Sequence, residues 1–192
     1  MNRRDAIARV GLLVGGTVIG AESFLSGCTK RSSDKVSRIL FSNEIVSLMD
    51  EVGETILPTT ASAPGAKAAR IGEFMKTIVL DCYEEKDQVI FINGAGLVQQ
   101  NAQLKYGKTF HALDEKEKYQ LISSLDTEAK EHKQKIKKED DVHYFTMIKQ
   151  LTLWGYFTSQ IGSENALRYL PVPGKFVGCV DYTKGDRAWS EI

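Results

Sequence analysis

The sequence is poor in the residues that most often build metal and catalytic sites, with only three histidines and three cysteines. It contains no Cys-x-x-Cys-His segment, so the chain cannot attach a c-type haem through the usual thioether bonds. The histidines, His111, His132 and His143, do not stand in a nucleophile–base pattern, which leaves a catalytic triad without support. We therefore expect no catalytic, cofactor-binding or metal-ligating residue in this chain.

Three segments resemble functional motifs only superficially. Residues 94–96 (Gly-Ala-Gly) are a fragment of the dinucleotide-binding glycine pattern without its third glycine or a preceding strand, so helix packing is the better interpretation. Residues 128–132 lack the first histidine of a metalloprotease helix. Asp140, Asp141 and His143 could be drawn as metal ligands, but acidic residues are also favoured at the start of a helix. We interpret the two aspartates as helix caps.

An excess of charge of one sign and a long apolar run are both lacking. The chain has 25 basic and 25 acidic residues, so it carries no electrostatic footprint for nucleic acid. No apolar stretch reaches the roughly 18 residues of a membrane-spanning helix. Its 192 residues, 42% of them apolar, fit one globular domain with a sizeable core.

The first 28 residues have the pattern of an export signal. Arg3 and Arg4 form a basic region, Val10–Ala21 an apolar region, and the small-residue stretch that ends at Cys28 matches a lipoprotein lipobox. We expect residues 1–27 to be a signal peptide of the twin-arginine type, removed before an acylated Cys28, although the residues after the arginines depart from the usual pattern. The mature protein would then be exported and lipid-anchored at the periplasmic face of a bacterial membrane.

The remaining cysteines leave two alternatives open. Residues 28–38 are polar and charged, as in a flexible tether between a lipid anchor and a folded body. If Cys28 carries lipid, Cys82 and Cys179 are the only thiols left in an oxidising compartment. They could form one disulfide or remain two buried or free thiols, because the sequence does not give the distance between their Cα atoms.

Apolar residues at spacings of three and four predict helices throughout residues 39–192. The first three are expected from Ser42 to Pro58, over Ile71–Val79 and over Lys86–Tyr106. The third contains Gly94 and Gly96, each of which costs a helix about 1 kcal/mol relative to alanine. This helix is therefore either broken there or packed closely against another helix.

Two further helices follow. Asp114 and Glu117 have the spacing of a capping box, and the helix they begin continues into the charged stretch that ends at Lys138. Asp140 or Asp141 is expected to cap the next helix, which runs to Trp154. A strand signal appears only over residues 176–180. We predict an all-α fold, a bundle-like array of about five or six helices in a single domain, residues 39–192.

The chain changes character in residues 155–192, which we expect to form an irregular C-terminal arm. Prolines and glycines there prevent a long helix, and aromatic residues are frequent. The rings must be buried on the chain's own helices or on another protein, and the sequence favours neither. The candidate partner-binding residues are Trp154, Tyr156, Phe157, Tyr169, Phe176, Tyr182 and Trp189.

Several blocks together resemble the gluconate 2-dehydrogenase subunit 3 family. The C-terminal blocks Gly155–Gly162, Ala166–Tyr169, Pro171–Phe176 and Lys184–Trp189 carry most of the resemblance. Earlier blocks, Ile56–Thr60 with Pro64–Ala66 and the leading Asn2–Arg4, extend it over essentially the whole chain.

The resemblance implies a small, non-catalytic subunit of a membrane-associated dehydrogenase. Its large partner would be an FAD-containing flavoprotein that oxidises sugars or sugar acids and passes electrons to a cytochrome c, and the small subunit would assist folding and export of that flavoprotein. The family supplies no catalytic residue to carry over, and the lipobox at Cys28 would add a membrane anchor. The alternative is a stand-alone periplasmic lipoprotein that binds a ligand or an envelope component.

Overall fold

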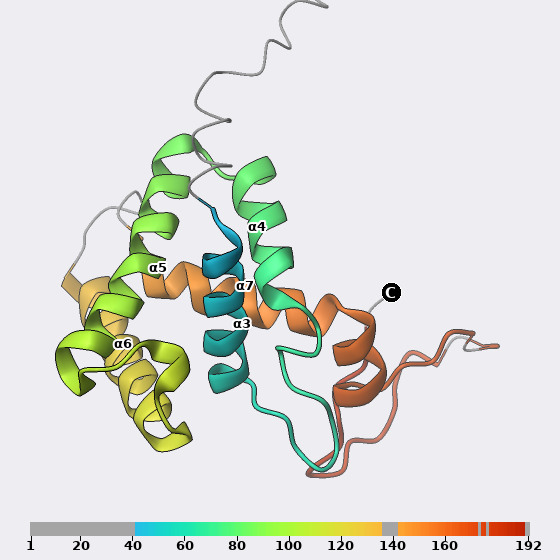
Figure 1. Cartoon of the computed structure of the whole chain (residues 1–192). Coiled ribbons are helices and arrows are strands. Elements are labelled where there is room, and N and C mark those ends of the chain that lie inside the picture. The colour runs from blue at the N-terminus through green and yellow to red at the C-terminus, as the bar shows by residue number, and fades with distance from the viewer. Residues whose placement is uncertain (1–40, 136–141, 173, 176, 191–192) are drawn as a thin grey trace, which may run out of the picture. The chain divides into compact units, whose positions relative to one another are not determined.

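The structure is a computed structural model that describes residues 41–135, 142–172, 174–175 and 177–190. All of them belong to the unit that spans residues 37–192. The helices, shown in Figure 1, are α3 (Asn43–Ile56), α4 (Ile71–Cys82), α5 (Glu85–Tyr106), the 3₁₀ turn η2 (Phe110–Ala112), α6 (Glu115–Lys135), α7 (Tyr144–Thr158) and the π-helical turn η3 (Gly162–Ala166). The described residues contain no strand, only an isolated β-bridge between Arg168 and Trp189. The predicted all-α array is confirmed.

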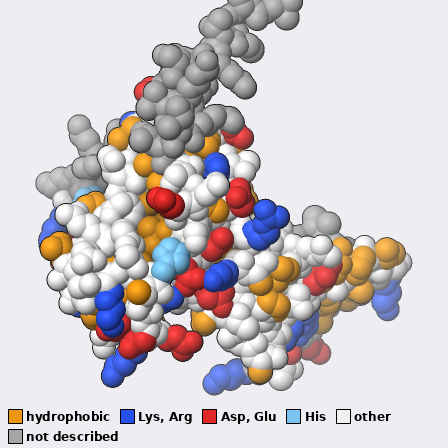
Figure 2. Space-filling view, in the orientation of Figure 1, with side chains coloured by type: hydrophobic (Ala, Val, Ile, Leu, Met, Phe, Trp, Pro, Cys, Tyr) orange, Lys and Arg blue, Asp and Glu red, His pale blue; other side chains and the backbone are white. Residues whose placement is uncertain are grey.

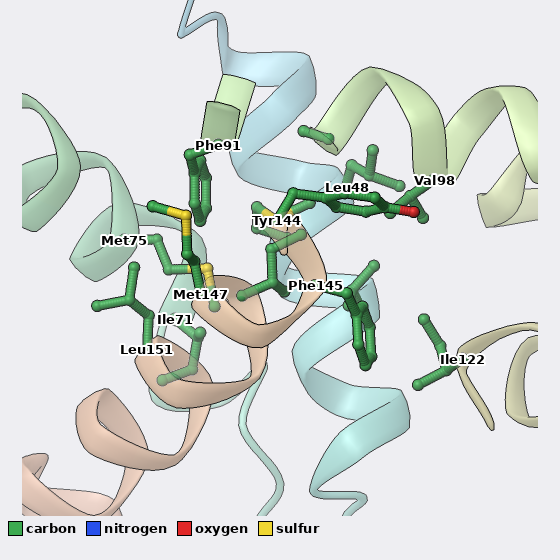
Figure 3. Packing of buried hydrophobic residues seen from close by; sticks show 14 of the residues in the cluster. Leu48, Ile71, Met75, Phe91, Val98, Ile122, Tyr144, Phe145, Met147 and Leu151 are labelled. Carbon is green, nitrogen blue, oxygen red and sulfur yellow. The ribbon is translucent and has the colours of Figure 1, made fainter. Parts of the chain in front are cut away.

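Helices α3 and α7 form the centre of the array, because each contacts α4, α5 and α6 as well as the other. The inward face of α7 buries Phe145, Ile148 and Leu151 almost completely. In Figure 3, Met147 of α7 lies near Met75 and Phe91, Leu151 lies near Ile71, and Phe145 lies on the side of Ile122. Each fully buried side chain of this size contributes about 1.5–3 kcal/mol, so packing around α7 holds the array together.

The N-terminal caps of the helices agree with the sequence-based predictions at two helices and differ at a third. Asp114 and Glu117 form the expected capping box: the Glu117 amide donates to Asp114 Oδ1 at 2.7 Å, and the Asp114 amide donates to Glu117 Oε2 at 3.0 Å. Ser42 is the N-cap residue of α3, although its side chain makes no capping hydrogen bond. The prediction that Asp140 or Asp141 caps α7 is wrong. His143 takes that position, and its Nδ1 accepts a hydrogen bond from the Phe145 amide at 3.2 Å.

Helix α5 is continuous, and its two internal glycines differ in their surroundings. A Cβ atom on Gly94 would lie 2.4 Å from Cβ of the buried Tyr144, so the glycine lets α5 and α7 approach closely. A Cβ atom on Gly96 would meet nothing within 4 Å. The close-packing alternative is therefore confirmed at Gly94, whereas packing among the described residues gives no reason for Gly96.

Two carboxylates hold the connection between α3 and α4. Glu54 accepts hydrogen bonds from the amides of Thr59 and Lys67, at 2.8 and 3.0 Å. Glu51 pairs with Lys67 and, at 2.7 Å, with Lys118 of α6. Burial alone would raise the pKa of Glu51, but the hydrogen bonds from Lys118 and Lys67 outweigh this effect and lower it to about 2. Glu51 therefore remains ionised and ties the connection to α6.

Candidate partner-binding site

The irregular arm begins later than the sequence indicated. Helix α7 continues to Thr158 and η3 to Ala166, so the irregular segment starts at Leu167 rather than at residue 155. Gly155 lies inside α7 and does not end it. The glycine is needed there for packing, because a Cβ atom at this position would lie 2.4 Å from the Phe74 ring. From here on, the arm means the described residues between Leu167 and Ser190.

The candidate aromatic residues divide into a buried and an exposed group. Tyr156 is only 4% exposed, and its hydroxyl donates to the backbone oxygen of Pro64 at 2.6 Å. It packs within its own chain and is therefore unsuited to partner contact. Trp154 and Phe157 are 51% and 37% exposed on α7, and Trp154 meets the Phe74 ring edge-on at 5.4 Å between centroids. Phe176 lies outside the described residues.

The arm exposes a series of apolar side chains. Figure 2 shows hydrophobic side chains gathered along this segment. The exposed residues are Tyr169, Leu170, Val172, Val177, Val180, Tyr182 and Trp189. Val172 and Tyr182 are the most exposed of them, at 79% and 75%. Monomeric proteins rarely leave apolar side chains together in solvent, so such a segment is typical of a binding surface.

Backbone hydrogen bonds close the arm at its base. The Arg168 amide donates to Ala188 O, and the Ser190 amide donates to Arg168 O, both at 2.8 Å. The Arg168 guanidinium also pairs with Asp186 at 2.8 Å and lies 5.3 Å from the centre of the Trp189 ring. A hydrogen bond from the Thr183 amide and the contact with Arg168 lower the pKa of Asp186, which keeps the pair charged. The arm is thus a closed loop whose two ends are fastened at Arg168.

The three histidines lie in two places. His111 Nε2 is 3.0 Å from Ser47 Oγ, a pair that the sequence could not reveal because 64 positions separate the two residues. Both side chains are exposed, and no carboxylate within the described residues hydrogen-bonds His111 to orient it as a base. The rings of His132 and His143 lie 5.2 Å apart, and burial lowers the pKa of His143.

The described ranges contain no group of three or more metal-ligating side chains. Asp140 and Asp141, which with His143 formed the candidate metal-ligand set, lie outside those ranges. Arg3 and Arg4 of the expected export signal and Cys28, the expected lipid anchor, also lie outside them. Cys82 and Cys179 are exposed free thiols, so the structure has the free-thiol alternative rather than the disulfide.

The described residues thus form an all-α domain with a closed arm that exposes apolar side chains. Residues 43–174, more than half of the chain, match the family described as Gluconate 2-dehydrogenase subunit 3. The chain belongs to this family, which consists of accessory subunits of multi-subunit dehydrogenases. Comparison with curated proteins and with solved structures finds no match.

The family match includes the α-helices of the described residues, α3 to α7, and ends at Gly174, inside the arm. The returning half of the arm, with Tyr182 and Trp189, therefore lies beyond the matched region. Within the part of the chain that the structure describes, no helix combines the length and the hydropathy needed to cross a membrane.

Proposed function

We propose that this chain is the non-catalytic small subunit of a periplasmic, FAD-dependent sugar or sugar-acid dehydrogenase. It would assist folding and twin-arginine export of the flavoprotein large subunit and anchor that subunit to the membrane. The FAD would belong to the large subunit, and a cytochrome c subunit would accept the electrons. The observation that carries the proposal is the match of residues 43–174 to the subunit 3 family.

The arm is the contact that we assign to the large subunit. Its exposed apolar side chains would leave water on binding, and aromatic side chains of this kind dominate interface energies. Because Arg168 fastens both ends of the loop, less conformational freedom is lost on binding than for a free tail. Trp154 and Phe157 add exposed rings on α7, the helix that leads to η3 and the arm.

The N-terminal pattern supports the roles in export and anchoring. A twin-arginine route carries folded proteins, so a chain with Arg3 and Arg4 could carry a folded flavoprotein with it. Acylated Cys28 would then hold the complex at the membrane. Cys28→Ser should release the protein from membranes, and retention would mean that another subunit provides the anchor.

The test is co-expression of the tagged chain with its genomic neighbours, followed by purification and a visible spectrum. Recovery of a large chain with flavin absorbance supports the proposal. A solitary, colourless protein overturns it in favour of the stand-alone lipoprotein. In the complex, the double variant Val172→Ala and Tyr182→Ala should weaken retention of the large chain, whereas Tyr119→Ala, a 66% exposed control on α6, should not. Equal retention of all variants would exclude the arm as the contact.

A further inference from the structure

Helix α7 begins at a cap that a proton can remove. His143 is the N-cap residue of this helix, and its Nδ1 accepts a hydrogen bond from the Phe145 amide at 3.2 Å. An imidazole nitrogen accepts a hydrogen bond only while it carries no proton, so the cap requires a neutral His143 with its proton on Nε2. The usual N-cap residues, which are serine, threonine, aspartate and asparagine, do not change their charge near neutral pH.

The surroundings of His143 oppose a positive charge on its ring in three ways. Its side chain is only 9% exposed, so protonation would place a charge away from water. The ring lies at the N-terminus of α7, where the helix dipole has its positive end. The ring of His132, on α6, lies 5.2 Å away, so a charge on either histidine disfavours a charge on the other. The cap is therefore held in the neutral form by its position in the fold.

One neighbour favours the protonated form. Glu128 Oε1, on α6, lies 3.7 Å from His143 Nε2, but this glutamate is 63% exposed, so water weakens its attraction. The ring of Tyr144, 4.4 Å away, stays neutral because burial raises the pKa of Tyr144 to about 12. Among the described residues, the titratable groups that act on His143 are Glu128 and His132. Burial outweighs the attraction to Glu128, so the pKa of His143 lies below its ordinary value of 6.5.

The capped turn belongs to the core of the domain. Tyr144 and Phe145, the first two residues of α7, are 8% and 1% exposed, and Figure 3 shows both rings in the packed core. Tyr144 also lies against Gly94, at the close approach of α5 and α7. Opening of this turn would therefore loosen the contact of α7 with α5 as well as the junction of α7 with α6.

We propose that His143 is a pH-sensitive switch, whose protonation below neutral pH releases the first turn of α7. A proton on Nδ1 turns the acceptor into a second donor that faces the Phe145 amide, so the capping hydrogen bond is lost. The neutral ring stabilises the fold above pH 6.5, and this stabilisation is lost as the pH falls from 6.5 through the lower pKa of His143 in the folded chain. The switch concerns the chain by itself and does not depend on the proposed function.

The first experiment is a nitrogen-15 NMR titration of the histidine rings of the full chain between about pH 5 and pH 8. At neutral pH the His143 ring should carry its proton on Nε2, and its titration midpoint should lie below 6.5. Hydrogen exchange in the same samples should show the protection factor of the Phe145 amide falling about fivefold on acidification, which is the effect of losing one helix cap. A proton on Nδ1 at neutral pH, or a midpoint at or above 6.5, overturns the proposal.

Substitution of each histidine in turn completes the test. His143→Asn keeps a capping side chain that does not titrate, so the loss of Phe145 protection on acidification should disappear. His132→Asn keeps the cap and should raise the titration midpoint of His143, because the second ring can no longer carry a charge. His111→Asn is the matched control, since His111 pairs with Ser47 instead, and it should leave the loss unchanged. An equal loss in the wild type and in His143→Asn overturns the switch, and if that variant does not fold, the wild-type titration still decides.

Discussion

Two glycines that lie two positions apart in α5 should respond oppositely to the same substitution. At Gly94, an added Cβ atom would lie 2.4 Å from Cβ of Tyr144, a buried side chain that is 8% exposed. Overpacking of a core typically costs about 1–3 kcal/mol, and a contact this short belongs near the upper end. Alanine returns about 1 kcal/mol of helix propensity, so Gly94→Ala should destabilise the fold by about 2 kcal/mol.

At Gly96 only the helix-propensity effect remains, because no atom of the described residues lies within 4 Å of the added Cβ atom. Gly96→Ala should therefore stabilise the chain by about 1 kcal/mol. For a chain of this size 1 kcal/mol shifts the thermal midpoint by about 2–4 °C, so the Gly94 variant should unfold about 4–8 °C earlier and the Gly96 variant about 2–4 °C later. Thermal unfolding followed by far-ultraviolet circular dichroism measures both. Shifts in the same direction would refute the packing of α5 on α7 described above.

Three further outcomes concern other parts of the fold. The lowered pKa of Glu51, about 2, stabilises the fold at pH values above the ordinary glutamate pKa, and this stabilisation is lost as the pH falls from about 4.5 towards 2. The loss is at most about 3 kcal/mol of the free energy of unfolding. It should largely disappear in Glu51→Gln, and unfolding in urea measured across that pH range tests this. Tyr156→Phe leaves the backbone oxygen of Pro64 without its donor and should cost about 0.5–1.5 kcal/mol in the same assay, and an unchanged midpoint would contradict the hydrogen bond. Arg168→Ala should leave the thermal midpoint of the helices unchanged but speed proteolytic cleavage within the arm, and equal cleavage rates would mean that Arg168 does not fasten the loop.

Local chemistry made much of the helical fold predictable. The first helix lies between Ser42 and Pro58 as expected, because apolar spacing marks its face and the proline cannot continue it. The capping box at Asp114 and Glu117 involves residues three positions apart, so the sequence alone specifies it. The cap of α7 was missed because aspartate is a far commoner N-cap than histidine, yet His143 makes the hydrogen bond.

The surfaces were less predictable, because they depend on contacts between distant segments. Composition placed Tyr156 among the aromatic residues available to a partner, but its burial follows from the approach of Pro64, 92 positions away. Closure of the arm likewise requires Arg168 to meet the segment around Trp189. An open pocket lined by residues of α3, α5 and the η2 region, among them Leu48, Ile92 and His111, likewise depends on distant segments coming together, and no local pattern in the sequence encodes that arrangement.

Closure of the arm at Arg168 also affects how the length and sequence of the arm can change among members of this family. The entropy of closing a loop rises only with the logarithm of its length, so doubling the stretch between Leu170 and Tyr182 would cost about 0.6 kcal/mol. Insertions in that stretch should leave the hydrogen bonds at the base and the helices unchanged, because both lie outside it. We therefore expect that the arm, the contact we propose for the large subunit, can change in length or sequence without altering the helical domain.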